Sequence, residues 1–111
     1  MSPLRGVAKG NRFARAVAAR LHTEPRVLNG NRDQGDIVHR HWTLECKAPG
    51  RGQPLNLSTA MSEACKEALY AGTPSRYAVI TRRTGYPIDE AFFTIPLWMA
   101  CQVIPDLEAP A

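Results

Sequence analysis

Hydrophobic residues recur at helical spacing in two segments of the chain. Phe13, Ala16, Val17 and Leu21 lie three or four positions apart, and arginines occupy other positions between Lys9 and Leu21. This pattern predicts an amphipathic helix with a basic outer face. A second helix is predicted within NLSTAMSEACKEALYAG, residues 56–72, with Ser58 or Thr59 as its cap and Gly72 at its end. Its expected buried stripe consists of Ala60, Met61, Ala64, Cys65, Ala68 and Leu69.

The rest of the chain is rich in β-strand formers and turn residues. DIVHRHWTLECK, residues 36–47, predicts two short strands or one bent ribbon. RYAVITRR (76–83) and AFFTI (91–95) predict two more strands, separated by the turn TGYPIDE, and APGRGQP (48–54) predicts a loop. The segment 23–35 holds at most one short strand, near residues 26–28, and PLWMACQV predicts a final short helix starting at Pro96. The expected order is helix, strands, helix, two strands and short helix.

Length and composition indicate one domain with a modest core, because the chain has 111 residues and 44% of them are hydrophobic. Its net charge is +4, with a pI near 9.3. No acidic residue precedes Glu24, whereas five basic residues do: Arg5, Lys9, Arg12, Arg15 and Arg20. Such a block is either a solvated helix face or basic tail, or a surface that contacts phosphates.

Cysteine spacing and hydropathy favour a reduced, cytoplasmic protein. Cys46, Cys65 and Cys101 form no CxxC pair and no zinc-like pattern with the histidines. No apolar run reaches the roughly 20 residues of a membrane span, and the N-terminus lacks the apolar core of a signal peptide. The most hydrophobic stretch, AFFTIPLWMACQVI, is interrupted by Pro96 and belongs to a core or an interface.

The charged residues at the two ends of segment 36–47 suggest a metal site. Glu45 and Lys47 are two positions apart, so both project from one face of a strand while Cys46 points to the other. If a bend near Trp42 brings Asp36 alongside Glu45, two carboxylates, one ammonium and the Cys46 carbonyl form a site for Mg²⁺ or Mn²⁺. The alternative is an ordinary surface ion pair, since E-x-K triplets are common on solvated strands.

Several stretches together resemble the PD-(D/E)XK nuclease superfamily, and within it the small Holliday-junction resolvases of archaeal type and their phage-encoded relatives. They are Lys9-Gly10, Gly35-Asp36, LECK (44–47), LNLSTAMSEA (55–64), and RYAVITRR followed by FFTIPL. The resemblance covers roughly residues 8–104. It implies an α/β fold with a restriction-endonuclease-like core, in which a mixed central sheet is flanked by helices. It also implies metal ligands at Asp36 and Glu45, with Lys47 as the catalytic lysine; the Cys46 carbonyl completes the metal ligands expected from the strand pattern.

One position departs from the family pattern. In such resolvases the first helix normally contributes a glutamate to the metal site, but this chain has Ala14 or a neighbour there. Either water, Asn11, His22 or a residue from elsewhere replaces that ligand, or the metal site is weakened. We expect Glu63 and Lys66 on the exposed side of the second helix, although a lysine or glutamate there can approach the active site in this superfamily.

The expected function is a Mg²⁺- or Mn²⁺-dependent endonuclease that cuts branched or junction DNA in recombination and repair. Symmetric paired incision requires two active sites, and therefore a homodimer. The expected location is the cytoplasm, that of a bacterial host if the protein is phage-encoded, and no association with a membrane is expected. The expected single domain spans 1–111, with a flexible basic arm at 1–8 and a flexible tail at 105–111. The expected DNA-binding residues are Lys9, Arg12, Arg15, Arg32 and Arg51.

Two alternatives to a resolvase stay open at this point. One is another PD-(D/E)XK nuclease of the repair or restriction type, and the other is a non-catalytic DNA-binding module that keeps the fold. Dimerisation is expected through the C-terminal segment. Phe92 and Phe93 are adjacent on a strand, so one is expected to cover the core and the other to join an exposed apolar patch with Leu97, Trp98 and Met99. Alternatively, a helix of the same chain covers that patch.

Overall fold

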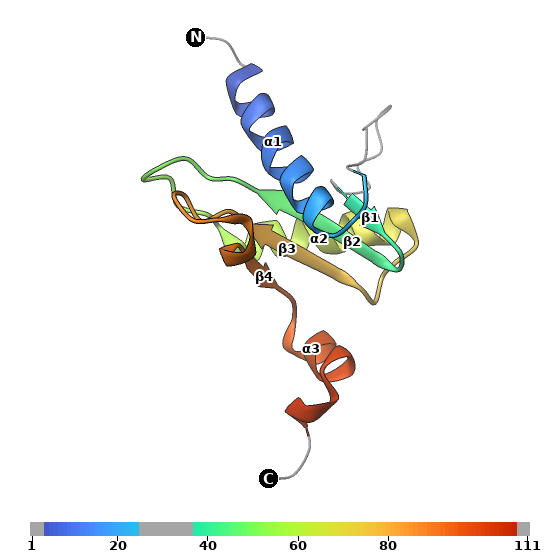
Figure 1. The fold of residues 1–111 in the computed structure, drawn as a ribbon. Coiled ribbons are helices and arrows are strands. Elements are labelled where there is room, and N and C mark those ends of the chain that lie inside the picture. The colour runs from blue at the N-terminus through green and yellow to red at the C-terminus, as the bar shows by residue number, and fades with distance from the viewer. Residues whose placement is uncertain (1–3, 25–36, 109–111) are drawn as a thin grey trace.

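The structure is a computed structural model that describes residues 4–24 and 37–108 (Figure 1). Its helices and strands follow the predicted order, and two 3-10 turns (η) are added to them. The elements are α1 (Leu4–Arg20), β1 (Ile37–His39), β2 (Trp42–Lys47), α2 (Leu57–Ala71), β3 (Tyr77–Thr81), η1 (Ile88–Glu90), β4 (Phe92–Thr94), α3 (Leu97–Val103) and η2 (Pro105–Leu107). The possible strand near residues 26–28 lies outside the described residues.

The four strands form one mixed sheet in the order β1-β2-β3-β4. β1 and β2 are antiparallel and form a hairpin, in which Ile37 pairs with Leu44, so segment 36–47 contains two strands rather than one bent ribbon. β2 and β3 are parallel, with α2 as the crossover between them, and β4 returns antiparallel to β3. The chain is therefore an α+β protein with a mixed sheet and three helices in its described part.

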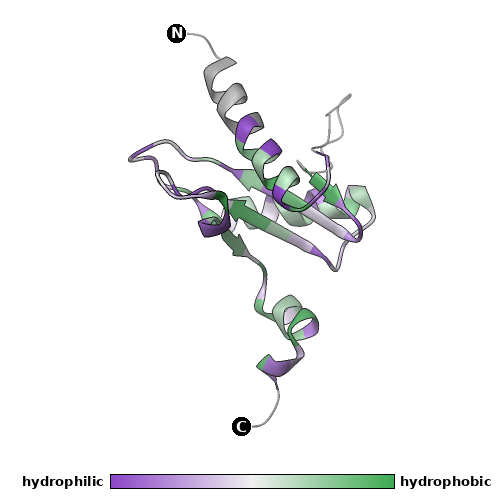
Figure 2. Cartoon of the chain, viewed as in Figure 1, coloured by the Kyte–Doolittle hydropathy of each residue, from purple (hydrophilic) through white to green (hydrophobic). Residues whose placement is uncertain are grey.

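A helix covers each face of the sheet (Figure 1). Even-numbered residues of β2 and β3 pack with α1, and odd-numbered residues pack with α2, because side chains alternate along a strand. The cluster on the α1 face consists of Phe13, Ala14, Val17, Ala18, Ile37, Leu44, Cys46, Ala78 and Ile80. The cluster on the α2 face consists of Ala60, Ala64, Ala68, Tyr77, Val79 and Met99. In Figure 2, much of β3 and β4 is coloured as hydrophobic, whereas α1 carries several hydrophilic positions.

The first helix is longer than predicted and turned slightly about its axis. It begins at Leu4 rather than Lys9, so residues 4–8, expected as part of a basic arm, are helical. Ala14 and Ala18 share the buried face with Phe13 and Val17, whereas the predicted Ala16 is exposed. The arginines of this helix whose side chains are described, Arg12, Arg15 and Arg20, are all exposed. The predicted basic outer face is therefore confirmed.

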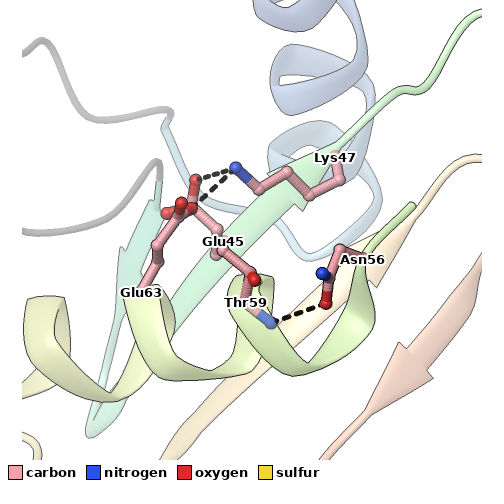
Figure 3. Close-up of polar contacts among 5 residues, drawn as sticks. All are labelled: Glu45, Lys47, Asn56, Thr59 and Glu63. Carbon is pink, nitrogen blue, oxygen red and sulfur yellow. Dashed lines mark hydrogen bonds and ion pairs between the residues drawn. The ribbon is translucent and has the colours of Figure 1, made fainter. Parts of the chain in front are cut away.

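The second helix begins with a different cap from the predicted one. The Asn56 side chain accepts a hydrogen bond from the Thr59 backbone N–H at 3.0 Å, so neither Ser58 nor Thr59 is the cap (Figure 3). Asparagine is among the best N-cap residues because its short side chain reaches the free N–H groups of the first turn. Gly72 ends the helix as predicted, in the left-handed conformation at φ 80°.

The buried stripe of α2 matches the prediction except at its end, since Met61 and Cys65 are partly buried and pack against the same cluster as the alanines. Glu67, which was not predicted, is buried as well. Ala60, Ala64 and Ala68 lie four residues apart and contact the sheet, and their small size lets the helix approach closely. The prediction that Leu69 is buried was wrong, since it is 64% exposed.

We expect Asn56→Ala to lower the free energy of unfolding by about 1 kcal/mol, because it removes the acceptor for the Thr59 N–H. Ser58→Ala, a change in the same turn that leaves this bond intact, serves as the control and stays near wild type. Urea unfolding of the two variants measures the difference. Equal loss in both would contradict Asn56 as the cap.

The C-terminal segment is less covered than predicted. Phe92 and Phe93 are 56% and 52% exposed, so neither is buried in the core. Phe93, on the edge strand β4 of the described sheet, packs edge-on against Trp42 with ring centroids 5.7 Å apart, so it covers the α1 face only in part. Met99 is fully buried in the α2 cluster rather than in an exposed patch, while Leu97 and Trp98 are exposed.

Within the described ranges, no helix combines the length and the apolar character that a membrane span requires.

Candidate active site

Strand β2 places two charged side chains on the face of the sheet covered by α2. Glu45 and Lys47 occupy alternate positions of the strand and project toward α2 (Figure 3). The Cys46 side chain lies on the opposite face, in the apolar cluster under α1. The expected division of this tripeptide between the two faces is therefore confirmed.

Lys47 is held between two carboxylates. Its Nζ donates a hydrogen bond to Glu63 Oε2 on α2 at 2.9 Å and lies 3.5 Å from Glu45 Oε1 (Figure 3). Partial burial alone would lower the pKa of Lys47, but the hydrogen bond to Glu63 and the charges of both carboxylates outweigh it, so this pKa is raised above its ordinary value of 10.5. At neutral pH the side chain is an ammonium ion, which can stabilise negative charge but cannot accept a proton.

Glu45 carries a buried oxygen that lacks a hydrogen-bond donor. Its side chain is only 10% exposed, and Oε2 is buried with no donor among the described residues. Removing a carboxylate oxygen from water without a partner is unfavourable, so a cation that coordinates it would offset this cost. A hard divalent cation with oxygen ligands fits this group.

The backbone of β2 adds a second kind of oxygen. The odd-numbered residues of β2 direct their backbone N–H and C=O groups toward β3. The Thr43 N–H donates a hydrogen bond to the Arg76 carbonyl, and the Lys47 carbonyl accepts one from the Arg82 N–H. Backbone groups of successive strand residues point to opposite sides, so the Cys46 carbonyl points away from β3 and toward the β1 side. This side is next to the end of β1, where Ile37 pairs with Leu44.

Part of the predicted site lies outside the described residues. Asp36, one position before β1, and Arg32 belong to the undescribed segment 25–36, and the side chain of Lys9 is likewise not described. Among the residues that are described, no three histidines, cysteines, aspartates or glutamates come together as a potential metal site. The structure thus brings together Glu45, Lys47 and the Cys46 backbone, and it leaves Asp36 as a prediction.

The three predicted DNA-binding arginines that the structure describes are exposed, but on two different surfaces. Arg12 and Arg15 lie on α1, which packs on the sheet face opposite the Glu45 side chain. Arg51 lies in the loop that follows β2, the strand of Glu45 and Lys47. The same placement of α1 puts Ala14 in the apolar cluster under that helix.

Glu63 is a site residue that the sequence pattern did not assign. Its side chain is about half exposed, as expected for the outer part of α2, yet it hydrogen-bonds Lys47 and lies beside Glu45 (Figure 3). The signal in the sequence is its position between Ala60 and Ala64, next to the alanines that contact the sheet. Its oxygens are a further possible source of metal ligands on this face.

Comparisons of the chain with protein-family models, with curated proteins and with solved structures found no match.

Proposed function

We propose that the protein is a metal-dependent DNA endonuclease with a restriction-endonuclease-like core, and that it acts as a Holliday-junction resolvase. One observation carries the proposal: Glu45 presents a buried carboxylate oxygen for which residues 4–24 and 37–108 supply no hydrogen-bond donor, beside an ammonium group that two carboxylates hold in place. A protein that used Glu45 only for stability would be expected to satisfy both oxygens. The E-x-K spacing on one strand face matches the resemblance to PD-(D/E)XK nucleases.

In this proposal, oxygens of Glu45, Cys46 and Asp36 would hold the cation. Glu45 provides the buried carboxylate, Cys46 its backbone carbonyl, and Asp36 a second carboxylate. When bound, Mg²⁺ or Mn²⁺ would act as a Lewis acid that polarises a phosphate oxygen of the DNA and lowers the pKa of a water molecule. The Lys47 ammonium stabilises the charge that accumulates on the phosphate oxygens as water attacks phosphorus and the P–O bond breaks. Glu63 positions Lys47 through their hydrogen bond.

Basic side chains outside this site bind the DNA backbone in the proposal. The chain has a net charge of +4, and Arg12, Arg15 and Arg51 are exposed. Together with Lys9 and Arg32 they would contact phosphates, which positions a duplex without reading its sequence. This property suits an enzyme that recognises DNA structure rather than base order.

A panel of labelled DNA substrates tests the proposal: a four-way junction, nicked duplex, flap and linear duplex, each with Mg²⁺ or with EDTA. A resolvase makes paired incisions in the junction and leaves linear duplex intact. Equal cutting of linear duplex would indicate a restriction-like nuclease. Binding without any cutting would indicate a non-catalytic module and overturn the enzyme assignment.

Homodimerisation through the C-terminal segment is part of this proposal. Four large hydrophobic residues are exposed on the edge strand β4 and at the start of α3: Phe92, Phe93, Leu97 and Trp98. A twofold contact between two copies would bury them. We expect Leu97→Glu to convert a dimer to monomer in sedimentation equilibrium at micromolar concentration. Leu69→Glu, at an exposed leucine of α2 outside this set, should leave the dimer intact. A monomeric wild-type chain would refute the dimer.

A further inference from the structure

A pocket of about 400 Å³ lies between α1 and the turn that connects β3 to β4. Its lining includes three arginines, Arg12, Arg82 and Arg83, beside Phe13, Tyr86 and Ile88. Only Arg12 belongs to the residues expected to bind DNA. We call this set the arginine pocket.

The arginine pocket carries positive charge that acidic side chains of the described residues neutralise only in part. Arg83 pairs with Glu90 at 3.3 Å, but neither Arg12 nor Arg82 has an acidic partner within the described parts of the chain. Arg20, on the same helix as Arg12, contrasts with them because it forms an ion pair with Asp89. The charge of the pocket is therefore available to an anion.

Two of the three guanidinium groups have features typical of a binding site. The Arg82 Nε–H is buried and has no hydrogen-bond acceptor among the described residues, which is unfavourable until a ligand supplies an oxygen. Arg83 is fixed by its stacking on two rings, with its guanidinium carbon 3.8 Å from the Tyr86 centroid and 4.9 Å from that of Phe92. A planar guanidinium fork matches the geometry of phosphate oxygens.

The arginine pocket adjoins the candidate active site through the backbone. Arg82 directly follows β3, and its N–H donates to the carbonyl of Lys47 at 2.9 Å. The two sites thus meet at the carboxyl ends of the parallel strands β2 and β3, with the pocket by α1 and the Glu45 side chain by α2. A polyanionic chain that crosses this end of the sheet would reach both.

We propose that the arginine pocket binds a backbone phosphate of the DNA other than the phosphate that is cut. This inference rests on the proposed nuclease function for its choice of DNA as the source of the phosphate. It adds Arg82 and Arg83 to the DNA-binding surface, and it assigns Arg12 to a specific phosphate rather than to a diffuse basic face.

The test compares the double variant Arg12→Gln/Arg82→Gln with the control Arg20→Gln, whose arginine is already paired. We expect the double variant to bind duplex and four-way junction about tenfold or more weakly, with a salt slope reduced by about 0.9 for one lost phosphate contact. Arg20→Gln should change affinity less than twofold. Should the double variant not fold, the single change of the exposed Arg12 gives the same comparison.

A nuclear magnetic resonance readout follows the Arg82 Nε–H signal in uncut complexes, prepared without divalent cation. Duplex DNA should shift this signal, and Arg20→Gln should not prevent the shift. An unmoved signal, or unchanged DNA affinity in the double variant, would overturn the inference, while Mg²⁺-dependent cutting by wild type would still support the proposed function. Conversely, DNA binding that depends on Arg12 and Arg82 in a protein that never cuts would support the pocket and refute the nuclease.

Discussion

Glu45→Gln is expected to abolish DNA cleavage while DNA affinity stays equal to wild type or increases. The amide keeps the size of the side chain but loses the charge that holds the cation and repels phosphate. Metal polarisation is worth several kcal/mol, so the single-turnover rate should fall by about 1,000-fold or more. Binding in the presence of Ca²⁺ and cleavage in the presence of Mg²⁺ are measured on the same junction, and Asp36→Asn should behave alike.

The stability of Glu45→Gln separates a catalytic role from a structural one. Oε2 of Glu45 is buried with no donor in the described ranges, so neutralising this carboxylate removes an unfavourable charge, but it also removes the attraction between Oε1 and Lys47 at 3.5 Å. Because these two effects oppose each other, we expect the free energy of unfolding without divalent cation to stay close to that of wild type. A clear loss of stability together with normal cleavage would assign Glu45 to the fold and remove it from the active site.

Lys47→Ala is expected to reduce the single-turnover cleavage rate by about 100- to 1,000-fold with little change in DNA affinity, because the ammonium acts on charge that develops in the transition state. Lys47→Arg keeps the charge and should recover part of the rate. Ser58→Ala, on the first turn of α2 and outside the contacts of Lys47, is the matched control for handling and folding. An unchanged rate in Lys47→Ala would reduce the residue to an ion-pair partner of Glu63.

The raised pKa of Lys47 fixes the expected pH dependence. The folded-state pKa exceeds 10.5 because the contacts with Glu63 and Glu45 outweigh partial burial, so its contribution to stability is present below the unfolded pKa. That contribution is lost as the pH rises through the folded pKa. Cleavage measured from pH 7 to 9 should therefore show no decline from deprotonation of Lys47, and Lys47→Arg should have the same profile in this range.

The sequence pattern predicted the elements well because they depend on local chemistry. Local sequence patterns predicted the strands of segment 36–47, the turn around residues 84–90 and helix α2. Each pattern involves residues that are close together in the sequence. The same alternation correctly placed Glu45 and Lys47 on one face and Cys46 on the other. These positions follow from the strand period alone.

The errors concern features that depend on packing between distant segments. Leu69 fits the helical stripe by spacing, yet it is 64% exposed, whereas Met61 and Cys65 at equivalent positions are partly buried. One of Phe92 and Phe93 was expected to cover the core, yet β4 is at the edge of the described sheet and both rings are more than half exposed. Glu63 and Lys47, which form a hydrogen bond, are 16 positions apart in the sequence, and Arg12 and Arg82, which line one pocket, are 70 positions apart. Periodicity does not reveal contacts between residues this far apart. Asp36 lies outside the described residues, so its place beside Glu45 stays a prediction.

The most direct test of the central claim is the rate at which the purified chain cuts a labelled four-way junction as Mg²⁺ is added, with Glu45→Gln purified in parallel. A nuclease site at Glu45 and Lys47 predicts that wild-type cutting starts from zero in EDTA, rises to saturation with Mg²⁺, and is absent in the variant at every concentration. Cutting that persists in EDTA, that is equal in Glu45→Gln, or that never appears with Mg²⁺ or Mn²⁺ would contradict it.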